Sequence, residues 1–310
     1  MASFNNSRAH PWRPDVILGF PENRRRAGLL ATALHAKYAD IETHTFPDGE
    51  SLVRIPEVET CRGQHVAVFR ALDKPNTKIV ELLLVASLFA AARDLTLIAP
   101  YLCYMRQDKA FHAGEAVSQA VIGKLLAANY RRFVTVDPHL HRQPSLDEVL
   151  PGRPALCLTA ADAIADYIRH TLPVDTVVLG PDAESARLVG RVAVRAGREW
   201  SVAEKHRSGD HAVEVTLPDT ISFDKRTVAV VDDVISSGHT IACIATAVHK
   251  AGAARVIACA THALYDSAGA AVMAAAGVDS VVSSDSVAHD SNTFSVLETI
   301  AWSLRDHHAD

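Results

Sequence analysis

Two adjacent carboxylates and a run of small hydroxyl residues stand close together near residue 235, directly after the apolar run Thr227–Val231. The carboxylates are Asp232 and Asp233, and the small residues are Ser236, Ser237, Gly238 and Thr240. Loop amides at the start of a helix bind anions, and carboxylates at a strand end accept hydrogen bonds from vicinal sugar hydroxyls. The pattern therefore predicts a sugar-phosphate site. The alternative is an acidic turn that holds no ligand.

Cationic and imidazole side chains elsewhere could act on phosphate groups. Lys205 and Arg207 lie in a hydrophilic stretch, Arg106 follows an apolar strand and turn, and His139 alternates with His141. Lysine offers a movable point charge, and arginine a fork for two oxygens. Lys205 and Arg207 could equally belong to a solvated loop, whereas the position of Arg106 after an apolar strand and turn argues against simple solvation. The histidines could be hydrogen-bonded at a strand end or could ligate a metal. These residues alone leave the alternatives open.

Seven short runs with strand character alternate with helix-length segments rich in Ala and Leu. The runs are Val66–Phe69, Leu95–Ala99, Phe133–Val136, Thr176–Leu179, Thr227–Val231, Val256–Ala260 and Ser280–Val282. This alternation predicts an α/β fold with parallel sheets that helices cover on both faces. Open sheets of this kind bind ligands at the carboxyl ends of their strands, which is where Asp232 and Asp233 fall.

The order of strands and helices repeats within the chain. Val66–Phe69 aligns with Val228–Val231, and two further strands follow each at similar spacing. We therefore expect two similar domains, residues 1–152 and 153–310. The halves differ in chemistry, because the first has Arg70 at the position where the second has its acidic pair.

Composition restricts the class of protein. The chain has 310 residues, of which 48% are hydrophobic and 22% charged, and its net charge is −5. A sizeable core is therefore expected, without general attraction to nucleic acid or to anionic membranes. The five cysteines include no C-x-x-C pair, which favours a reducing cytoplasm over disulfides or zinc. The polar N-terminal residues are not expected to act as a secretory signal. Ile79–Ala92 suggests a buried helix too short to span a bilayer. Phe294–Leu304 suggests an amphipathic packing helix.

The segment Thr227–Thr240 resembles the loop that binds phosphoribosyl diphosphate (PRPP) in type I phosphoribosyltransferases and in PRPP synthetases. Four further segments resemble PRPP synthetases, the ribose-phosphate diphosphokinases: Phe46–Glu50, Pro100–Asp108, Val134–His139 and Glu204–Arg207. The combination is far more specific than any one segment. The resemblance implies two tandem domains like those of type I phosphoribosyltransferases, each a parallel sheet flanked by helices. The first would hold the nucleotide and the second ribose 5-phosphate.

The resemblance also implies an activity in nucleotide biosynthesis: transfer of the diphosphoryl group of MgATP to O1 of ribose 5-phosphate, which gives PRPP and AMP. The implied catalytic residues are Lys205, Arg207 and His139. The implied ATP-binding residues are Phe46, Asp48, Glu50, Arg106, Gln107 and Asp108. The implied ribose 5-phosphate-binding residues are Asp232, Asp233, Ser236, Ser237, Gly238 and Thr240. His139 and Asp182 are the implied ligands of Mg²⁺.

In the family the segment matching Phe46–Glu50 reaches the adenine of a neighbouring subunit, so a homodimer or larger homo-oligomer with shared active sites is expected. This chain departs from the family pattern at several positions, which suggests a divergent branch: Pro138, Glu184, Ser185, Ser236, Ser237 and His239. Two alternative functions are a non-catalytic regulatory homologue and a transferase that consumes PRPP.

Overall fold

The structure is a computed structural model that describes residues 12–89, 94–140, 145–208 and 212–306. The chain forms two compact units. The first contains the chain up to Thr135, Ser145–Leu158 and the end from Leu297, and the second contains a segment beginning at Val136 and Thr159–Val296. The C-terminal helix α8 (Leu297–Asp306) packs on α1 (Arg24–Leu34) of the first unit. The chain thus passes between the units more than once.

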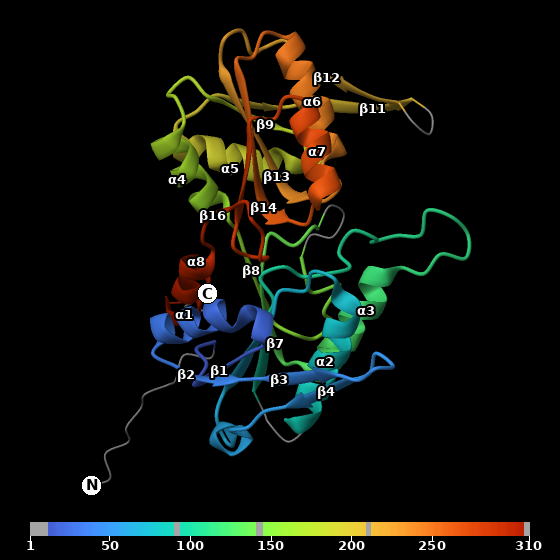
Figure 1. The fold of residues 1–310 in the computed structure, drawn as a ribbon, viewed down its shortest axis with the longest axis vertical. Coiled ribbons are helices and arrows are strands. Elements are labelled where there is room, and N and C mark those ends of the chain that lie inside the picture. Colours follow the sequence, from blue (N-terminus) through green and yellow to red (C-terminus); the bar gives the residue numbers. More distant parts are fainter. Residues whose placement is uncertain (1–11, 90–93, 141–144, 209–211, 307–310) are drawn as a thin grey trace. The chain divides into compact units, whose positions relative to one another are not determined.

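The first unit is built on a six-stranded sheet with the order β2-β1-β5-β6-β7-β8, and its pairs from β2 to β7 are parallel (Figure 1). Its strands are β1 (Val16–Gly19), β2 (Lys37–Asp40), β5 (Val66–Phe69), β6 (Leu95–Ile98), β7 (Arg132–Val136) and β8 (Ala155–Leu158). The longer helices after α1 are α2 (Pro75–Leu88) and α3 (Ser118–Asn129), and β3 (Glu42–Thr45) and β4 (Ser51–Arg54) form a separate hairpin. Short 3-10 turns lie at η1 (Pro21–Asn23) and η2 (Val58–Cys61).

The second unit has a parallel six-stranded sheet with the order β10-β9-β13-β14-β15-β16. Its strands are β9 (Val177–Gly180), β10 (Trp200–Val202), β13 (Thr227–Ile235), β14 (Arg255–Ala263), β15 (Ser280–Ser284) and β16 (Asn292–Phe294). Its helices are α4 (Ala161–Thr171), α5 (Ala186–Ala196), α6 (His239–Lys250) and α7 (Ser267–Ala275), with η3 (Ala183–Ser185). A hairpin of β11 (Glu204–Ser208) and β12 (Ala212–Thr216) stands apart from the sheet.

The two sheets have the same strand order, since each begins with its second strand, then its first, and continues through its central strands to the far edge. β5 and β13, which align in sequence, take the third place in their sheets. All seven strands expected from the sequence are present. The α/β class with two tandem parallel sheets is therefore confirmed.

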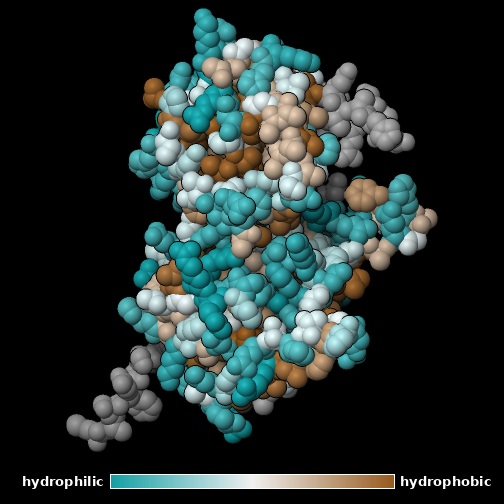
Figure 2. Space-filling view, in the orientation of Figure 1, coloured by the Kyte–Doolittle hydropathy of each residue, from teal (hydrophilic) through white to brown (hydrophobic). Residues whose placement is uncertain are grey.

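Helix α2 differs from the expectation of a buried helix. Ile79 and Leu82 are buried, but Val80, Leu84 and Leu88 are 51%, 37% and 49% exposed. Figure 2 shows hydrophobic residues on the surface of the first unit where α2 and α3 lie. A helix that is apolar all round normally lies in an interior, so this face of α2 lacks a cover within the described chain. No helix within the described ranges is long and apolar enough to cross a membrane.

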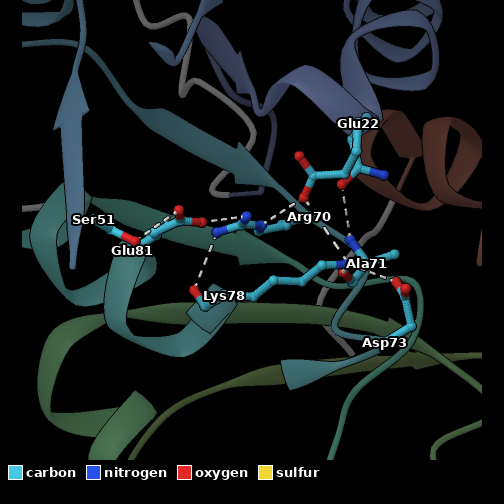
Figure 3. A network of polar contacts seen from close by, with 8 residues as sticks. Glu22, Ser51, Arg70, Ala71, Asp73, Lys78 and Glu81 are labelled. Atoms are coloured by element: carbon cyan, nitrogen blue, oxygen red, sulfur yellow. Dashed lines mark hydrogen bonds and ion pairs between the residues drawn. The ribbon is translucent and has the colours of Figure 1, made fainter. Parts of the chain in front are cut away.

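A buried ion-pair network closes the end of β5, the place that corresponds to Asp232 in the second unit (Figure 3). The Arg70 guanidinium lies 3.5 Å from the centre of the Phe20 ring and donates to Glu22 at 2.9 Å and to Glu81 at 2.5 Å. Arg70 and Glu81 are only 4% exposed. Ser51 of β4 donates to the other oxygen of Glu81, which links the network to the β3–β4 hairpin.

Lys78 of α2 completes the network. Its ammonium donates to Asp73 at 2.7 Å and to the carbonyl oxygen of Ala71 at 2.8 Å. The turn after β5 is thereby held to α2. Since its cations are paired with carboxylates and carbonyls of the same unit, the network has the composition of a structural element.

Glu81→Leu is expected to lower the free energy of unfolding by about 3–5 kcal/mol, because the substitution leaves a buried guanidinium with one partner fewer. Arg70→Met/Glu81→Leu should recover much of this loss, since it removes both charges. Urea denaturation measures both values. Glu42→Ala, which breaks an exposed pair with Arg54, is the control and should cost less than about 1 kcal/mol. Equal losses in Glu81→Leu and Glu42→Ala would contradict the structural role.

Candidate functional site

The carboxylates of the candidate site lie at the carboxyl end of β13. Four buried residues, Val228–Val231, lead into Asp232 and Asp233, which are partly buried. β13 lies between β9 and β14 in the sheet, and Asp182 follows the end of β9. Parallel strands bring their carboxyl ends to one edge of the sheet, so three carboxylates from two neighbouring strands gather there.

These carboxylates repel one another. Burial raises the pKa of Asp232 well above its usual value, and the charges of Asp233 and Asp182 raise it further. The Asp233 amide donates to Asp232 Oδ1 at 2.9 Å and offsets part of this cost. The Asp182 carboxylate accepts from the amides of Glu184 and Ser185, two positions where the chain departs from the family pattern. The crowded negative charge suits a ligand that is a cation or a hydroxyl donor.

His139 reaches the same carboxylate cluster. Its Nδ1 lies 2.7 Å from Asp233 Oδ2, and both side chains are about 20% exposed. A carboxylate can only accept, so Nδ1 carries the proton of this bond, and in the neutral ring the lone pair is on Nε2. Histidines that ligate metals commonly donate their other nitrogen to a carboxylate in this way. His141 lies outside the described residues.

The small-residue loop leads from β13 into α6. Gly238 caps the helix with φ +77°, and a Cβ there would lie 2.8 Å from the carbonyl oxygen of Gly269. The position therefore requires glycine. Ser236 and Thr240 are partly buried and Ser237 is exposed. The first amides of α6 have no acceptor within the helix and lie at its positive dipole end, so the loop can hold a phosphate.

The expected catalytic loop is a β-hairpin. Lys205 and Arg207 stand two residues apart on β11, opposite Val215 and Val213 of β12. The hairpin pairs only with itself, not with the six-stranded sheet of the second unit. The backbone thus presents both residues on a separate two-stranded element.

In the first unit, Phe46–Glu50 forms the tight turn between β3 and β4. The Phe46 amide donates to the Glu50 carbonyl at 2.8 Å, and the Glu50 amide donates to Asp48 Oδ1 at 3.1 Å. Gly49 has φ +90°, the left-handed conformation that this turn needs. The Phe46 ring is 40% exposed and packs edge-on against His44 with centroids 4.9 Å apart. The turn leaves an aromatic surface available to a ligand.

The other expected nucleotide residues lie between β6 and α3. Arg106 is exposed, and Gln107 and Asp108 are partly buried. Gln107 accepts a hydrogen bond from Ser118 at the start of α3, and its carbonyl oxygen accepts one from the Gln119 amide. The segment is therefore anchored to α3 while its arginine stays accessible. The two groups of nucleotide residues lie on separate segments of the first unit.

Sequence reasoning missed three polar residues beside the carboxylates of the second unit. Thr261 and His262 lie near the end of β14 and are almost fully buried, and Asp137 lies two residues before His139. Thr261 donates to Asp137 Oδ2 at 2.7 Å. The sequence does contain a signal for two of these residues. Thr261 and His262 directly follow the apolar run Val256–Ala260, just as Asp232 and Asp233 directly follow the apolar run Thr227–Val231.

Asp232→Asn is expected to raise the melting temperature at pH 8 in EDTA by roughly 2–4 °C, corresponding to about 1 kcal/mol. The asparagine oxygen can still accept from the Asp233 amide, but the repulsion is gone. Because the folded pKa of Asp232 is raised, its ionised form is unfavourable above that pKa, and the gain should shrink as pH falls and the wild-type carboxyl protonates. Calorimetry measures this, with exposed Asp219→Asn as the control. A lower melting temperature for Asp232→Asn would contradict the repulsion.

Two family models match the chain. Residues 16–129 match the N-terminal domain of ribose phosphate pyrophosphokinase, and residues 150–298 match the phosphoribosyl transferase domain. The ribose-phosphate pyrophosphokinase of Methanopyrus kandleri is 31% identical over 295 residues, 94% of this chain and 99% of the relative. Ribose-phosphate pyrophosphokinase 2 of Archaeoglobus fulgidus is 32% identical over 288 residues, 93% of this chain and 99% of the relative.

The fold has a solved counterpart. The crystal structure of phosphoribosylpyrophosphate synthetase from Mycobacterium smegmatis superposes with a TM-score of 0.79 at 24% identity and covers 94% of this chain and 98% of that one. The likeness extends over both sheets, and the identities near 30% over nearly the whole length mark a divergent member. The chain belongs to the ribose-phosphate pyrophosphokinase family.

Proposed function

We propose that this protein is a ribose-phosphate diphosphokinase that converts MgATP and ribose 5-phosphate into PRPP and AMP. The observation that carries the proposal is the carboxylate pair Asp232 and Asp233, followed by a phosphate-binding loop, in a chain similar over nearly its full length to pyrophosphokinases. The sequence departures at Ser236 and Ser237 keep hydroxyl groups in that loop.

In this proposal ribose 5-phosphate binds at the end of β13. Asp232 and Asp233 accept hydrogen bonds from the ribose hydroxyls, and the amides of Ser237 and Gly238 with the Thr240 hydroxyl hold the 5-phosphate. The anomeric oxygen O1 attacks the β-phosphorus of ATP. The bond from that phosphorus to the oxygen bridging it to the α-phosphorus breaks, AMP leaves with the electron pair, and the proton of O1 passes to water.

Cations stabilise the charge that spreads over the transferring phosphoryl oxygens. Lys205 and Arg207 on β11 are proposed to act on the diphosphoryl group, and Arg106 on the phosphates of ATP. Positioning and electrostatic stabilisation supply most of the catalysis in phosphoryl transfer. A hairpin separate from the sheet suits residues that must approach the ligand after it binds.

Magnesium fits the side chains at the end of β13, although no three His, Cys, Asp or Glu side chains of the described ranges form a complete cation cage. Mg²⁺ prefers one or two carboxylates, with phosphates and waters completing its octahedron. His139, which donates to Asp233, and Asp182, which adds to the carboxylate crowding, are the proposed ligands. When bound, Mg²⁺ neutralises negative charge on the phosphates.

The adenine is proposed to bind at Phe46, Asp48 and Glu50, with Gln107 and Asp108 near the nucleotide. The aromatic face of Phe46 can stack on a base, and carboxylates can accept from the adenine amino group. The proposal includes a homodimer or larger homo-oligomer in which this turn serves a neighbouring copy. The exposed apolar face of α2 supports this assembly, because a second copy would cover that face. Helix α2 also contacts β4, which belongs to the same hairpin as the Phe46 turn.

Cell location and macromolecular partners follow from composition. The five cysteines are free, which supports a reducing cytoplasm. The net charge of −5 offers no general attraction to nucleic acid or membranes. ATP and ribose 5-phosphate are the proposed partners.

Phosphorus NMR of the protein with ATP, ribose 5-phosphate and Mg²⁺ tests the activity. AMP with a diphosphate ester on C1 is the expected result, and omission of ribose 5-phosphate is the control. Formation of ADP would exclude diphosphoryl transfer. The absence of any turnover would favour the regulatory homologue, and formation of a nucleotide from PRPP and a base would favour the transferase.

Lys205→Ala is expected to lower kcat by about a thousandfold or more, with a much smaller change in KM for either substrate. The ammonium is most useful when the transferring group is loosest, so its loss acts on the transition state. Steady-state kinetics measures this, with exposed Lys250→Ala as the control. An unchanged kcat would remove Lys205 from the mechanism.

Mixed oligomers are expected to recover activity if active sites are shared. Asp48→Ala/Glu50→Ala lacks acceptors for adenine and Lys205→Ala lacks the catalytic cation, so each variant alone should be nearly inactive. After the two are unfolded, mixed and refolded, a mixed dimer holds one intact site.

A mixture of Lys205→Ala with Arg207→Ala is the matched control, because both changes lie on the same side of the site and should not complement. Differently sized tags and native mass spectrometry show whether mixed dimers form. Background activity in a verified mixed dimer of the first pair would contradict the shared site.

A further inference from the structure

A buried polar cluster lies at the end of β14 and takes no part in the reaction as proposed. Thr261 and His262 are 0% and 1% exposed, and they follow the apolar strand residues Val256–Ala260. Buried polar side chains are costly unless they are hydrogen-bonded. The partners of these two residues therefore indicate what the cluster holds in place.

Both residues bind the short segment that leads to His139. The Thr261 hydroxyl donates to Asp137 Oδ2 at 2.7 Å. His262 Nε2 lies 3.0 Å from the Val136 carbonyl oxygen and 3.3 Å from that of Asp137, so Nε2 carries the proton and donates. The Ala160 amide also donates to Asp137 Oδ2, at 2.9 Å.

The cluster is itself anchored from β15 and the turn after it. Ser286 Oγ lies 2.8 Å from His262 Nδ1 and 2.9 Å from the Thr261 carbonyl oxygen, and its single proton can serve either. Ser284 Oγ donates to the same carbonyl at 2.6 Å. When the Ser286 hydroxyl donates to Nδ1, the imidazole is held at both nitrogens in one orientation.

The segment that the cluster holds has an unusual backbone. Asp137 has φ +36°, in the left-handed region that residues other than glycine seldom adopt. Such a conformation persists only where several surrounding contacts impose it. Here Thr261, His262 and the Ala160 amide supply those contacts, and the chain reaches His139 two residues later.

We propose that Thr261 and His262 are positioning residues that set the backbone at Val136 and Asp137 so that His139 meets Asp233. This inference rests on the proposed function. β14 fixes the backbone before His139, and β13 fixes its ring through the bond from Nδ1 to Asp233 at 2.7 Å. The two strands are neighbours, with Val234 opposite His262, so one sheet edge sets both ends of the contact.

Three variants test the proposal by kinetics. Thr261→Val keeps the shape and removes the donor, His262→Leu removes the donor to Val136, and His262→Gln keeps a donor near the position of Nε2. Thr261→Val and His262→Leu should lower kcat by about 10–100-fold, the usual effect of losing a residue that orients a ligating or catalytic group. His262→Gln should recover most of the loss. His249→Leu is the matched control, because this histidine also binds two backbone carbonyls of the second unit, those of Ala253 and Gly277.

A double-mutant cycle separates positioning from general stability. In a His139→Ala background, Thr261→Val and His262→Leu should lower kcat no further, because they act through His139. Losses of the same size in both backgrounds would overturn the proposal. Thr261→Val, which conserves volume, carries the test if His262→Leu does not fold.

A spectroscopic test does not depend on activity. Two-dimensional ¹H–¹⁵N spectra of histidine-labelled protein report which nitrogen of His139 carries the proton. The wild type should show the proton on Nδ1, and Thr261→Val should show a mixture of tautomers. An unchanged His139 signal in Thr261→Val and His262→Leu would refute the positioning role. A wild type that makes no AMP would refute the proposed function and leave this result interpretable.

Discussion

The parallel pairing of β13 between β9 and β14 is the constraint on which the second unit depends. It brings the ends of three strands to one edge, with Asp182 after β9, Asp232 and Asp233 on β13, and His262 on β14. The buried strands stabilise this arrangement well enough to hold carboxylates that repel one another. A cluster of like charges lowers the stability of the free protein, and a bound ligand can offset this cost. Functional sites commonly lower stability in this way.

The two units carry different side chains at the end of the third strand of each sheet. At the end of β5, Arg70 is buried and paired with Glu22 and Glu81, so the strand end is closed by charges of opposite sign. At the end of β13 the charges are alike. The strand order of the two sheets is the same, so the difference lies in the residues at this strand end and in the longer course of β13. The repeat therefore keeps a common scaffold, while the proposed chemistry uses the second copy of this strand end.

The β3–β4 hairpin shows how the first unit can have a function without such a site. Ser51 of β4 joins the buried network of Arg70 through Glu81, while Phe46 in the turn stays exposed. The base of the hairpin is therefore anchored and its turn is presented outward. Helix α2 packs on β4 of this hairpin and keeps apolar residues exposed elsewhere on its surface, and both features suit an element that meets another molecule.

The sequence by itself determined the α/β class, the repeat, all seven expected strands and the acidic pair with its loop, because these depend on local runs and spacing. Edge elements such as β10 and β16, three residues each, were too short for such patterns to reveal. Only the tertiary structure decided which residues meet. Asp233 is the partner of His139 although 94 residues separate them, and Thr261 holds Asp137 across 124 residues. Neither contact joins strands that pair in one sheet. Both depend on how distant segments of the second unit pack together, which local spacing does not encode.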